Sequence, residues 1–178
     1  MTDRILGCLG LILAMALQGA AFADPPATTV DLVTHNEILV LASPGRLWPL
    51  VVEPSAWKKG AKLVSVGGPV GQQGERFRAV MSDGQIAFYA ENVEVVAEHR
   101  RTIRLNTADG RLIGYAVWQL TAQGTETRVQ YDVYSEVPFA SDDGTPAQQE
   151  AAKAAYREAN YKRFADELAA LKALAEGT

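Results

Sequence analysis

The chain offers few side chains that could catalyse a reaction. His35 and His99 are the only histidines, and the single cysteine, Cys8, lies in an apolar N-terminal segment. Neither histidine stands at metal-ligand spacing from another candidate ligand, and neither fits a nucleophile-base-acid arrangement. His35 falls on the strand face opposite Ile38 and Val40, and His99 falls in a turn, so both are expected at the surface. The sequence therefore identifies no catalytic residue, and we expect no metal and no cofactor.

Two groups of acidic residues could suggest acid-base chemistry, but both fit a structural role better. Asp142-Asp143 precedes Gly144, in a stretch where aspartate supports backbone turning. Glu91 and Glu94 alternate with apolar residues, as on a sheet with one face in water. We expect all of these carboxylates to be solvated.

Two arginines in the strand-like segment before these glutamates have two alternative placements. Arg76 and Arg78 share one face of their predicted strand, and they could pair with Glu91 across the sheet. A shift of one residue in the strand register would instead turn both side chains toward the interior.

The aromatic residues are the feature that exceeds an ordinary core. Strand alternation and helix periodicity direct one apolar set toward a shared interior: Phe77, Phe88, Trp118, Tyr131, Phe164 and Leu168. Core packing is one explanation for this set, and the lining of a ligand pocket is the other. Tyr131 would add a hydroxyl to such a pocket, and Asn92 and Gln119 are weaker polar candidates.

The elements that carry these residues begin with a strand over residues 30–42. Ser43 is expected to cap a short helix with Pro44 at its first position. A second short helical piece is expected around residues 55–59, ended by Gly60. The order of these elements predicts a strand that leads directly into two small helices.

The remainder reads as six further strands and a long helix. The strands are expected at residues 62–66, 75–82, 85–97, 102–107, 112–122 and 126–137, and short turns containing glycine separate several of them. Consecutive strands with such short links form an antiparallel meander. Thr145 is expected to cap a helix that runs to about Glu176, with an apolar stripe along one side.

Several short motifs in this order resemble those of a known family: Ile38-x-Val40-x-Ala42-Ser-Pro44, Leu47-Trp48, Trp57, Gly74-Glu-Arg76, Trp118-x-Leu120 and Gly124-Thr-Glu-Thr-Arg-Val129. Through them the chain resembles the START-like superfamily, and within it the polyketide cyclase/dehydrase-like (SRPBCC) group. The resemblance implies an α+β, helix-grip (START/Bet v1-like) fold: a curved antiparallel seven-stranded sheet around a long C-terminal helix, with two short helices after the first strand.

Residues 1–23 read as a signal peptide. An almost uncharged run follows Arg4, and Ala21 and Ala23 fit a small-residue cleavage site. An uncleaved membrane anchor is the alternative. Cleavage would leave a leader at residues 24–33, a START-like domain at residues 34–176 and no cysteine. We expect an exported soluble protein, periplasmic or secreted, with no stable membrane span.

Composition and charge agree with one ordinary globular domain. The 178 residues are 48% hydrophobic and 21% charged, with a formal net charge of −4, which disfavours nucleic acid as a partner. With the resemblance, this favours a binding protein for a small hydrophobic or amphipathic ligand, lipid- or polyketide-like. A cofactor-independent cyclase or dehydratase-type enzyme is the alternative, and a structural or interaction domain with a filled cavity is the second alternative. The sequence does not indicate an oligomeric state.

Overall fold

The computed structural model of the protein describes residues 31–58, 60–135 and 145–177. The elements follow in the order β1 (Asp31–Val40), α1 (Pro44–Val52), the 3-10 helix η1 (Pro54–Ala56), β2 (Ala61–Gly67), β3 (Arg76–Met81), β4 (Ile86–Val96), β5 (Arg100–Asn106), β6 (Leu112–Gln123), β7 (Glu126–Ser135) and α2 (Pro146–Glu176). Each predicted strand is confirmed within a few residues of its expected bounds. The expected signal peptide, most of the leader and the Asp142-Asp143 pair lie outside the described residues.

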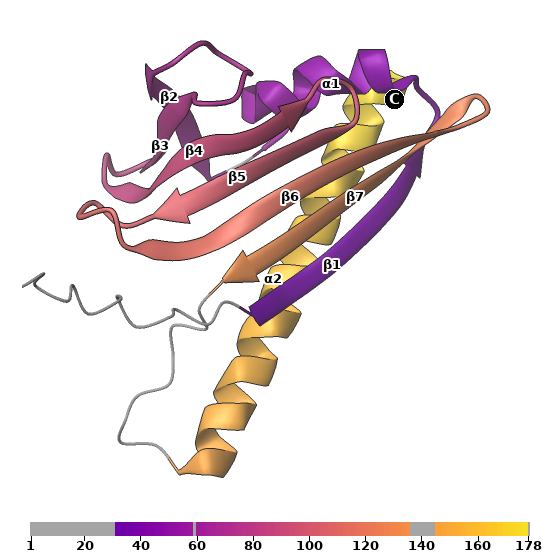
Figure 1. Ribbon diagram of the computed structural model, residues 1–178. Coiled ribbons are helices and arrows are strands. Elements are labelled where there is room, and N and C mark those ends of the chain that lie inside the picture. Colours follow the sequence, from indigo (N-terminus) through magenta and orange to yellow (C-terminus); the bar gives the residue numbers. More distant parts are fainter. Residues whose placement is uncertain (1–30, 59, 136–144, 178) are drawn as a thin grey trace, which may run out of the picture.

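The strands form one seven-stranded antiparallel sheet in the order β1-β7-β6-β5-β4-β3-β2. Strands β2 to β7 are neighbours in chain order, which confirms the predicted meander, and β1 joins the sheet beside β7. The sheet curves, and the long helix α2 crosses its concave side (Figure 1). The helix-grip architecture predicted from the sequence is therefore the observed one.

The transition from β1 into α1 follows the predicted capping chemistry. The Ser43 side chain accepts a hydrogen bond from the backbone N–H of Arg46, and Pro44 occupies the first helical position. The second helical piece is shorter than expected, because it is a single 3-10 turn that starts at Pro54. The indole N–H of Trp57 then donates to the carbonyl of Leu50 at 2.8 Å, which ties the end of this turn back to α1.

Helix α2 has the predicted start and end. Thr145 and Gln148 form a capping box at its N-terminus, and Gly177 adopts a left-handed conformation with φ 76° at its C-terminus. Its buried stripe consists of Asn160, Phe164, Leu168, Leu171 and Ala175. The one polar member is Asn160, whose side-chain amide donates to the carbonyl of Tyr156 one turn earlier.

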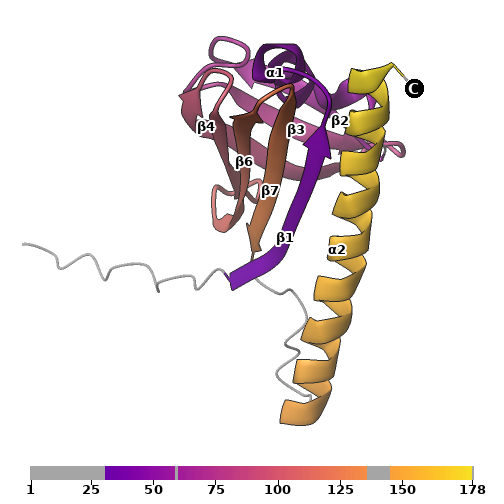
Figure 2. The ribbon, with the colours of Figure 1, turned by 90° about the vertical axis from the view of Figure 1, so that its right-hand side faces the viewer.

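Helix α2 is attached to the sheet at the β1 edge, as Figure 2 shows. The Asn36 amide donates to the carbonyl of Tyr161 at 3.1 Å. Nearer the C-terminus, Lys172 donates to the carbonyl of Leu39 at 2.6 Å, and Glu176 accepts from the N–H of Leu41 at 2.7 Å. The close backbone approaches of α2 are made to β1, with a smaller contact to α1. Helix α2 is therefore held along one edge of the concave face, while α1 approaches β6.

Side chains on the concave face alternate in size across neighbouring strands. Phe77 stands opposite Ala90, and Ile103 stands opposite Ala116. The alanines are almost fully buried, as is Ala79. Because a methyl group cannot reach α2 from the middle strands, these positions leave space between the sheet and the helix.

Candidate functional site

A hollow of about 470 Å³ lies between the concave face of the sheet and α2. Small-molecule pockets span about 300–1,000 Å³, so this volume suits a small ligand. Strands β2 to β7 contribute to its walls, together with the end of α1, the η1 turn and the segment from Tyr156 to Glu167 of α2. The lining is mostly apolar, with charged groups from Lys58, from Arg101 of β5 and from α2.

The aromatic residues predicted to share an interior do so. Of the proposed binding residues, these line the hollow: Phe77, Phe88, Trp118, Tyr131 and Phe164. Leu168 does not line it, because it packs into the core one turn further along α2, where it is 1% exposed. The binding role of the set remains a prediction.

Aromatic rings form a continuous chain along one wall. Trp57 meets Trp118 edge to face at 5.8 Å between ring centroids, and Trp118 stacks on Tyr131 at 4.0 Å. Tyr131 then meets Phe164 of α2 edge to face at 5.0 Å. Contacts of this geometry hold large apolar rings in fixed positions. The chain links the η1 turn, two strands and α2 into a rigid apolar surface.

Charged side chains lie where the η1 turn approaches α2. Lys58 Nζ is 3.1 Å from Glu167 Oε2, and it lies 5.8 Å from the Tyr131 ring centroid and 5.9 Å from that of Phe164. Burial alone would lower the pKa of Lys58, but Tyr131 and Glu167 outweigh it and hold that pKa above the ordinary lysine value. Lys58 is thus an ammonium at neutral pH and a poor candidate for a nucleophilic amine.

A buried polar network closes the other end of the hollow. The Arg101 side chain is 2% exposed. Its guanidinium donates to Asn92 at 2.9 Å and to the carbonyls of Val51 and Val52 at the end of α1, and it lies 3.8 Å from Glu75. Burial lowers the pKa of Arg101 below its usual value, and the nearby Glu75 opposes that effect. These contacts use the donors of Arg101 to hold α1 on the sheet.

Both weaker polar candidates for the pocket, Asn92 and Gln119, are wrong, because neither lines the main hollow. Asn92 is fully buried, but it does not line the hollow, because its amide donates to Glu75 and to the carbonyl of Gln72. Gln119 is exposed, at the side of a separate surface hollow. Of the three polar candidates, Tyr131 alone lines the main hollow.

The strand register settles the two alternatives for the arginine pair on β3. Arg76 stands opposite Glu91 and is exposed, while the neighbouring Phe77 is buried, so the outward placement holds. Glu91 forms its ion pair with Arg104 of β5, at 2.7 Å, rather than the predicted pair with β3. Arg76 and Arg104 are both cross-strand partners of Glu91, but the Arg76 guanidinium lies beside Gly67 instead, which leaves Glu91 to Arg104.

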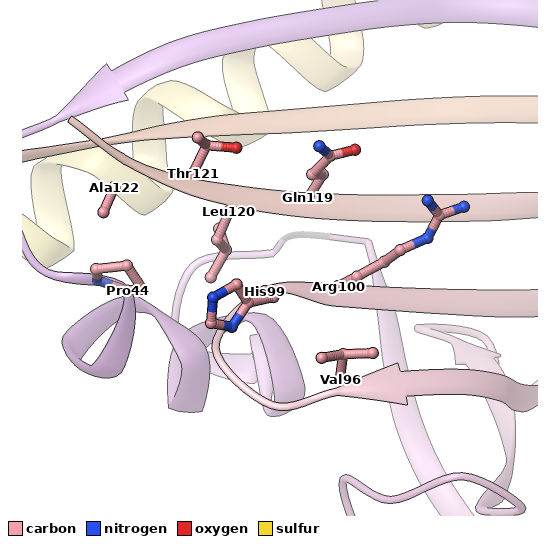
Figure 3. A pocket seen from close by; sticks show the side chains of 8 residues that line it. All are labelled: Pro44, Val96, His99, Arg100, Gln119, Leu120, Thr121 and Ala122. Carbon is pink, nitrogen blue, oxygen red and sulfur yellow. The ribbon is translucent and has the colours of Figure 1, made fainter.

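Both histidines are exposed, as predicted. His35 Nδ1 lies 2.6 Å from a carboxylate oxygen of Asp132, its cross-strand partner. His99 faces a shallow hollow of about 420 Å³ at the β4–β5 turn, where its imidazole points toward Leu120 (Figure 3). His99 Nδ1 lies 3.0 Å from the carbonyl of Ala97 in the same turn. Neither arrangement places a nucleophile beside the ring.

Sequence reasoning missed the charged residues of the main hollow. Lys58 follows Trp57 directly, and nothing in its own spacing indicated that it faces inward. Arg163 and Glu167 flank the predicted stripe residues Phe164 and Leu168, one helical turn apart. Their position beside the apolar stripe was the available signal, because residues next to a buried stripe lie at its border with solvent.

Two negative findings apply to the part of the chain that the structure describes. None of its helices there combines the length and the apolar character that a membrane crossing requires. The same residues contain no cluster of three or more His, Cys, Asp or Glu side chains that could hold a metal ion.

The curved antiparallel sheet and the long helix across its concave side form a helix-grip fold, which the chain shares with solved structures that include a Polyketide_cyc-like protein. Solved structures carry this assignment, since no protein-family model and no curated protein matches the chain.

Three solved structures illustrate the likeness. A protein of unknown function from Staphylococcus aureus aligns with TM-score 0.63 and 13% identity, over 81% of this chain and 95% of that one. A protein from Thermus thermophilus aligns with TM-score 0.59 and 17% identity, over 80% and 95%. A Polyketide_cyc-like protein from Corynebacterium glutamicum aligns with TM-score 0.55 and 13% identity, over 81% and 91%. At these identities the likeness is one of fold.

Proposed function

We propose that the protein is an exported binding protein that holds a small hydrophobic or amphipathic ligand, lipid- or polyketide-like, between its sheet and α2. The observation that carries this proposal is the aromatic wall of the 470 Å³ hollow, in which Trp118, Tyr131 and Phe164 face space rather than other side chains alone. Apolar walls with a few polar groups are the usual lining of small-molecule sites. The apolar N-terminal segment supports export.

A cofactor-independent enzyme of cyclase or dehydratase type is the second candidate, and Tyr131 is the residue that favours it. Its ring lines the hollow, and the charges of Lys58 and Arg101 act on it electrostatically. A phenol whose ring centroid lies 5.8 Å from the Lys58 ammonium can donate a hydrogen bond to a ligand carbonyl and stabilise the charge that develops there. In this reading the ligand would be a substrate.

The test begins with native mass spectrometry of the protein purified without detergent, followed by titration with Nile red, a neutral apolar dye. A co-purifying lipid, or saturable dye uptake that an apolar competitor reverses, supports the binding protein. A mass equal to that of the bare chain, together with no dye uptake, would leave the filled structural domain as the better description.

The Tyr131→Phe variant separates the binding protein from the enzyme. It keeps the ring and removes the hydroxyl, so a binding protein should retain dye uptake. If polyketone-like substrates are turned over by the native protein and not by Tyr131→Phe, the enzyme takes first place.

A further inference from the structure

The charges that line the main hollow are unequal. Among the described residues of its wall, Lys58, Arg101 and Arg163 are cationic, and Glu167 is anionic. Arg101 is occupied by Asn92, by two backbone carbonyls and by Glu75. The groups that remain for a ligand are therefore Lys58 and Arg163, with Glu167 as their acidic neighbour.

These groups stand at the border between the hollow and the outside. Arg163 and Glu167 also line a second, more open hollow beside α2, and so does Trp57. A residue that faces both spaces lies at the boundary between them. The Lys58–Glu167 ion pair spans this boundary, because it joins the residue after Trp57 to α2.

The two cations differ in how they are held. Lys58 is mostly buried, with its side chain 21% exposed, and its ammonium lies near the aromatic rings of Tyr131 and Phe164. Arg163 is exposed, donates to the neutral Asn160 side chain at 2.8 Å and places its guanidinium 4.3 Å from the Phe164 ring centroid. Both cations lie near the Phe164 ring, Lys58 Nζ at 5.9 Å and the Arg163 guanidinium at 4.3 Å from its centroid, so this side of the hollow carries two positive charges beside an apolar surface.

We propose that the ligand is a carboxylate-headed amphipath whose head group binds Lys58 and Arg163, with its apolar tail against Trp118, Tyr131 and Phe164. This inference rests on the binding function proposed above. In the unliganded protein the Glu167 carboxylate pairs with the Lys58 ammonium, so the ligand carboxylate must compete with Glu167 for Lys58. A charge-assisted hydrogen bond to a partly buried ammonium is stronger than one between neutral groups, which gives the head group its specificity.

The test compares dodecanoate with dodecanol, a neutral probe of the same tail length, each displacing Nile red at neutral pH. The native protein should bind dodecanoate about tenfold more tightly than dodecanol, the difference that one charge-assisted hydrogen bond makes. Lys58→Met should weaken dodecanoate binding much more than dodecanol binding and so remove most of this preference. Lys62→Met is the matched control, because Lys62 is exposed on β2 and does not line the hollow.

Glu167→Gln gives a change of the opposite sign, which a structural role would not produce. Removal of the competing carboxylate should tighten dodecanoate binding by about threefold relative to dodecanol binding. The double variant Lys58→Met, Glu167→Gln avoids an unpaired acid at the boundary, and it should also lack the preference. It keeps the test available if Lys58→Met alone fails to fold.

The outcomes separate this inference from the proposed function. If dodecanol and dodecanoate bind equally, or if Lys58→Met weakens both to the same extent, the head-group inference fails while the binding function stands. If Nile red does not enter the native protein, neither probe can displace it. The binding function then fails, and the head-group inference fails with it.

Discussion

Trp118 of β6 and Tyr131 of β7 are cross-strand partners whose rings stack with 4.0 Å between centroids and 20° between planes. Both rings line the hollow, and each meets a further aromatic residue, Trp57 on one side and Phe164 on the other. A molecule that displaces solvent from this wall must change the surroundings of the indole. The part of the tryptophan fluorescence that disappears in Trp118→Phe comes from this indole. That part therefore reports on molecules that enter the hollow.

Phe164→Ala tests whether the space beside this wall is already a void. A phenylalanine in a filled core costs about 3–5 kcal/mol when replaced by alanine, and enlargement of an existing hollow should cost less. Leu171→Ala is the matched control, since Leu171 is on the same stripe, fully buried and away from the hollow. Its cost should lie within the usual range of about 2–5 kcal/mol. Urea denaturation of both variants checks this, and a larger loss for Phe164→Ala than for Leu171→Ala would contradict it.

Arg101→Met should be among the most destabilising single changes to a polar residue. It leaves Glu75 buried without its cation and frees the carbonyls at the end of α1, and removal of one member of a buried ion pair costs about 3–5 kcal/mol. Arg104→Met, three residues along the same strand, breaks the half-exposed pair with Glu91 and should cost less than about 1 kcal/mol. Equal losses in the two denaturation curves would show that the buried network contributes little.

The histidines should tolerate substitution. His99→Ala removes an exposed ring from a turn and should change the free energy of unfolding by less than about 0.5 kcal/mol. His35→Ala also removes the contact with Asp132, an exposed pair, so its cost should stay below about 1 kcal/mol. Ligand binding should be unchanged in both, and loss of binding by a folded variant would give that histidine a functional role.

The Lys58–Glu167 pair should make part of the stability depend on alkaline pH. Tyr131 and Glu167 raise the folded-state pKa of Lys58 above its ordinary value of 10.5 despite the opposing effect of burial. A raised folded pKa contributes stability that is fully present below the unfolded value and is lost as the pH rises through the folded value. The stability difference between the native protein and Lys58→Met should be constant up to pH 10.5 and shrink above it. A difference that grows above that pH would have the wrong sign.

The exported protein should begin at Asp24. Ala21 and Ala23 satisfy the small-residue requirement of a signal cleavage site, and Asp24-Pro25 ends the apolar run. N-terminal sequencing of the protein from the periplasm or the medium checks this. Ala23→Phe should block cleavage and leave a longer precursor, whereas a protein that retains Met1 and sediments with membranes would be an anchored one.

The fold was accessible from the sequence because its signals are local. Turn glycines, the Ser43 cap and the capping box at Thr145 act within a few residues, and each predicted its element correctly. Strand alternation likewise placed Phe77 and Trp118 on the concave face. Errors arose where the environment of a side chain depends on residues far away in the sequence. The Asn92 side chain is buried, as that of a cavity residue would be, but its amide is hydrogen-bonded to Glu75 and Arg101.

The charged boundary of the hollow could not be predicted for the same reason. Lys58 and Glu167 are far apart in the chain and meet because α2 crosses the sheet beside the η1 turn. Leu168 was assigned to the hollow by periodicity, which gives the direction of a side chain and not the distance to the opposite wall. Where space remains depends on the curvature of the sheet and on how α2 is attached at β1, and neither quantity is encoded in a short segment.

The hydrogen bonds from α2 to the outer strand have a consequence for how the protein behaves at high concentration. An unprotected edge strand offers its N–H and C=O groups to the edge of another molecule, which is a route to aggregation. On β1 and just beyond it, Lys172 and Glu176 occupy the carbonyl of Leu39 and the N–H of Leu41, and α2 lies alongside the strand. The opposite edge, β2, carries an irregularity between Ser65 and Gly67 that interrupts regular pairing. The two edges are thus protected against intermolecular strand pairing by different means, one by a covering helix and the other by its own irregular backbone.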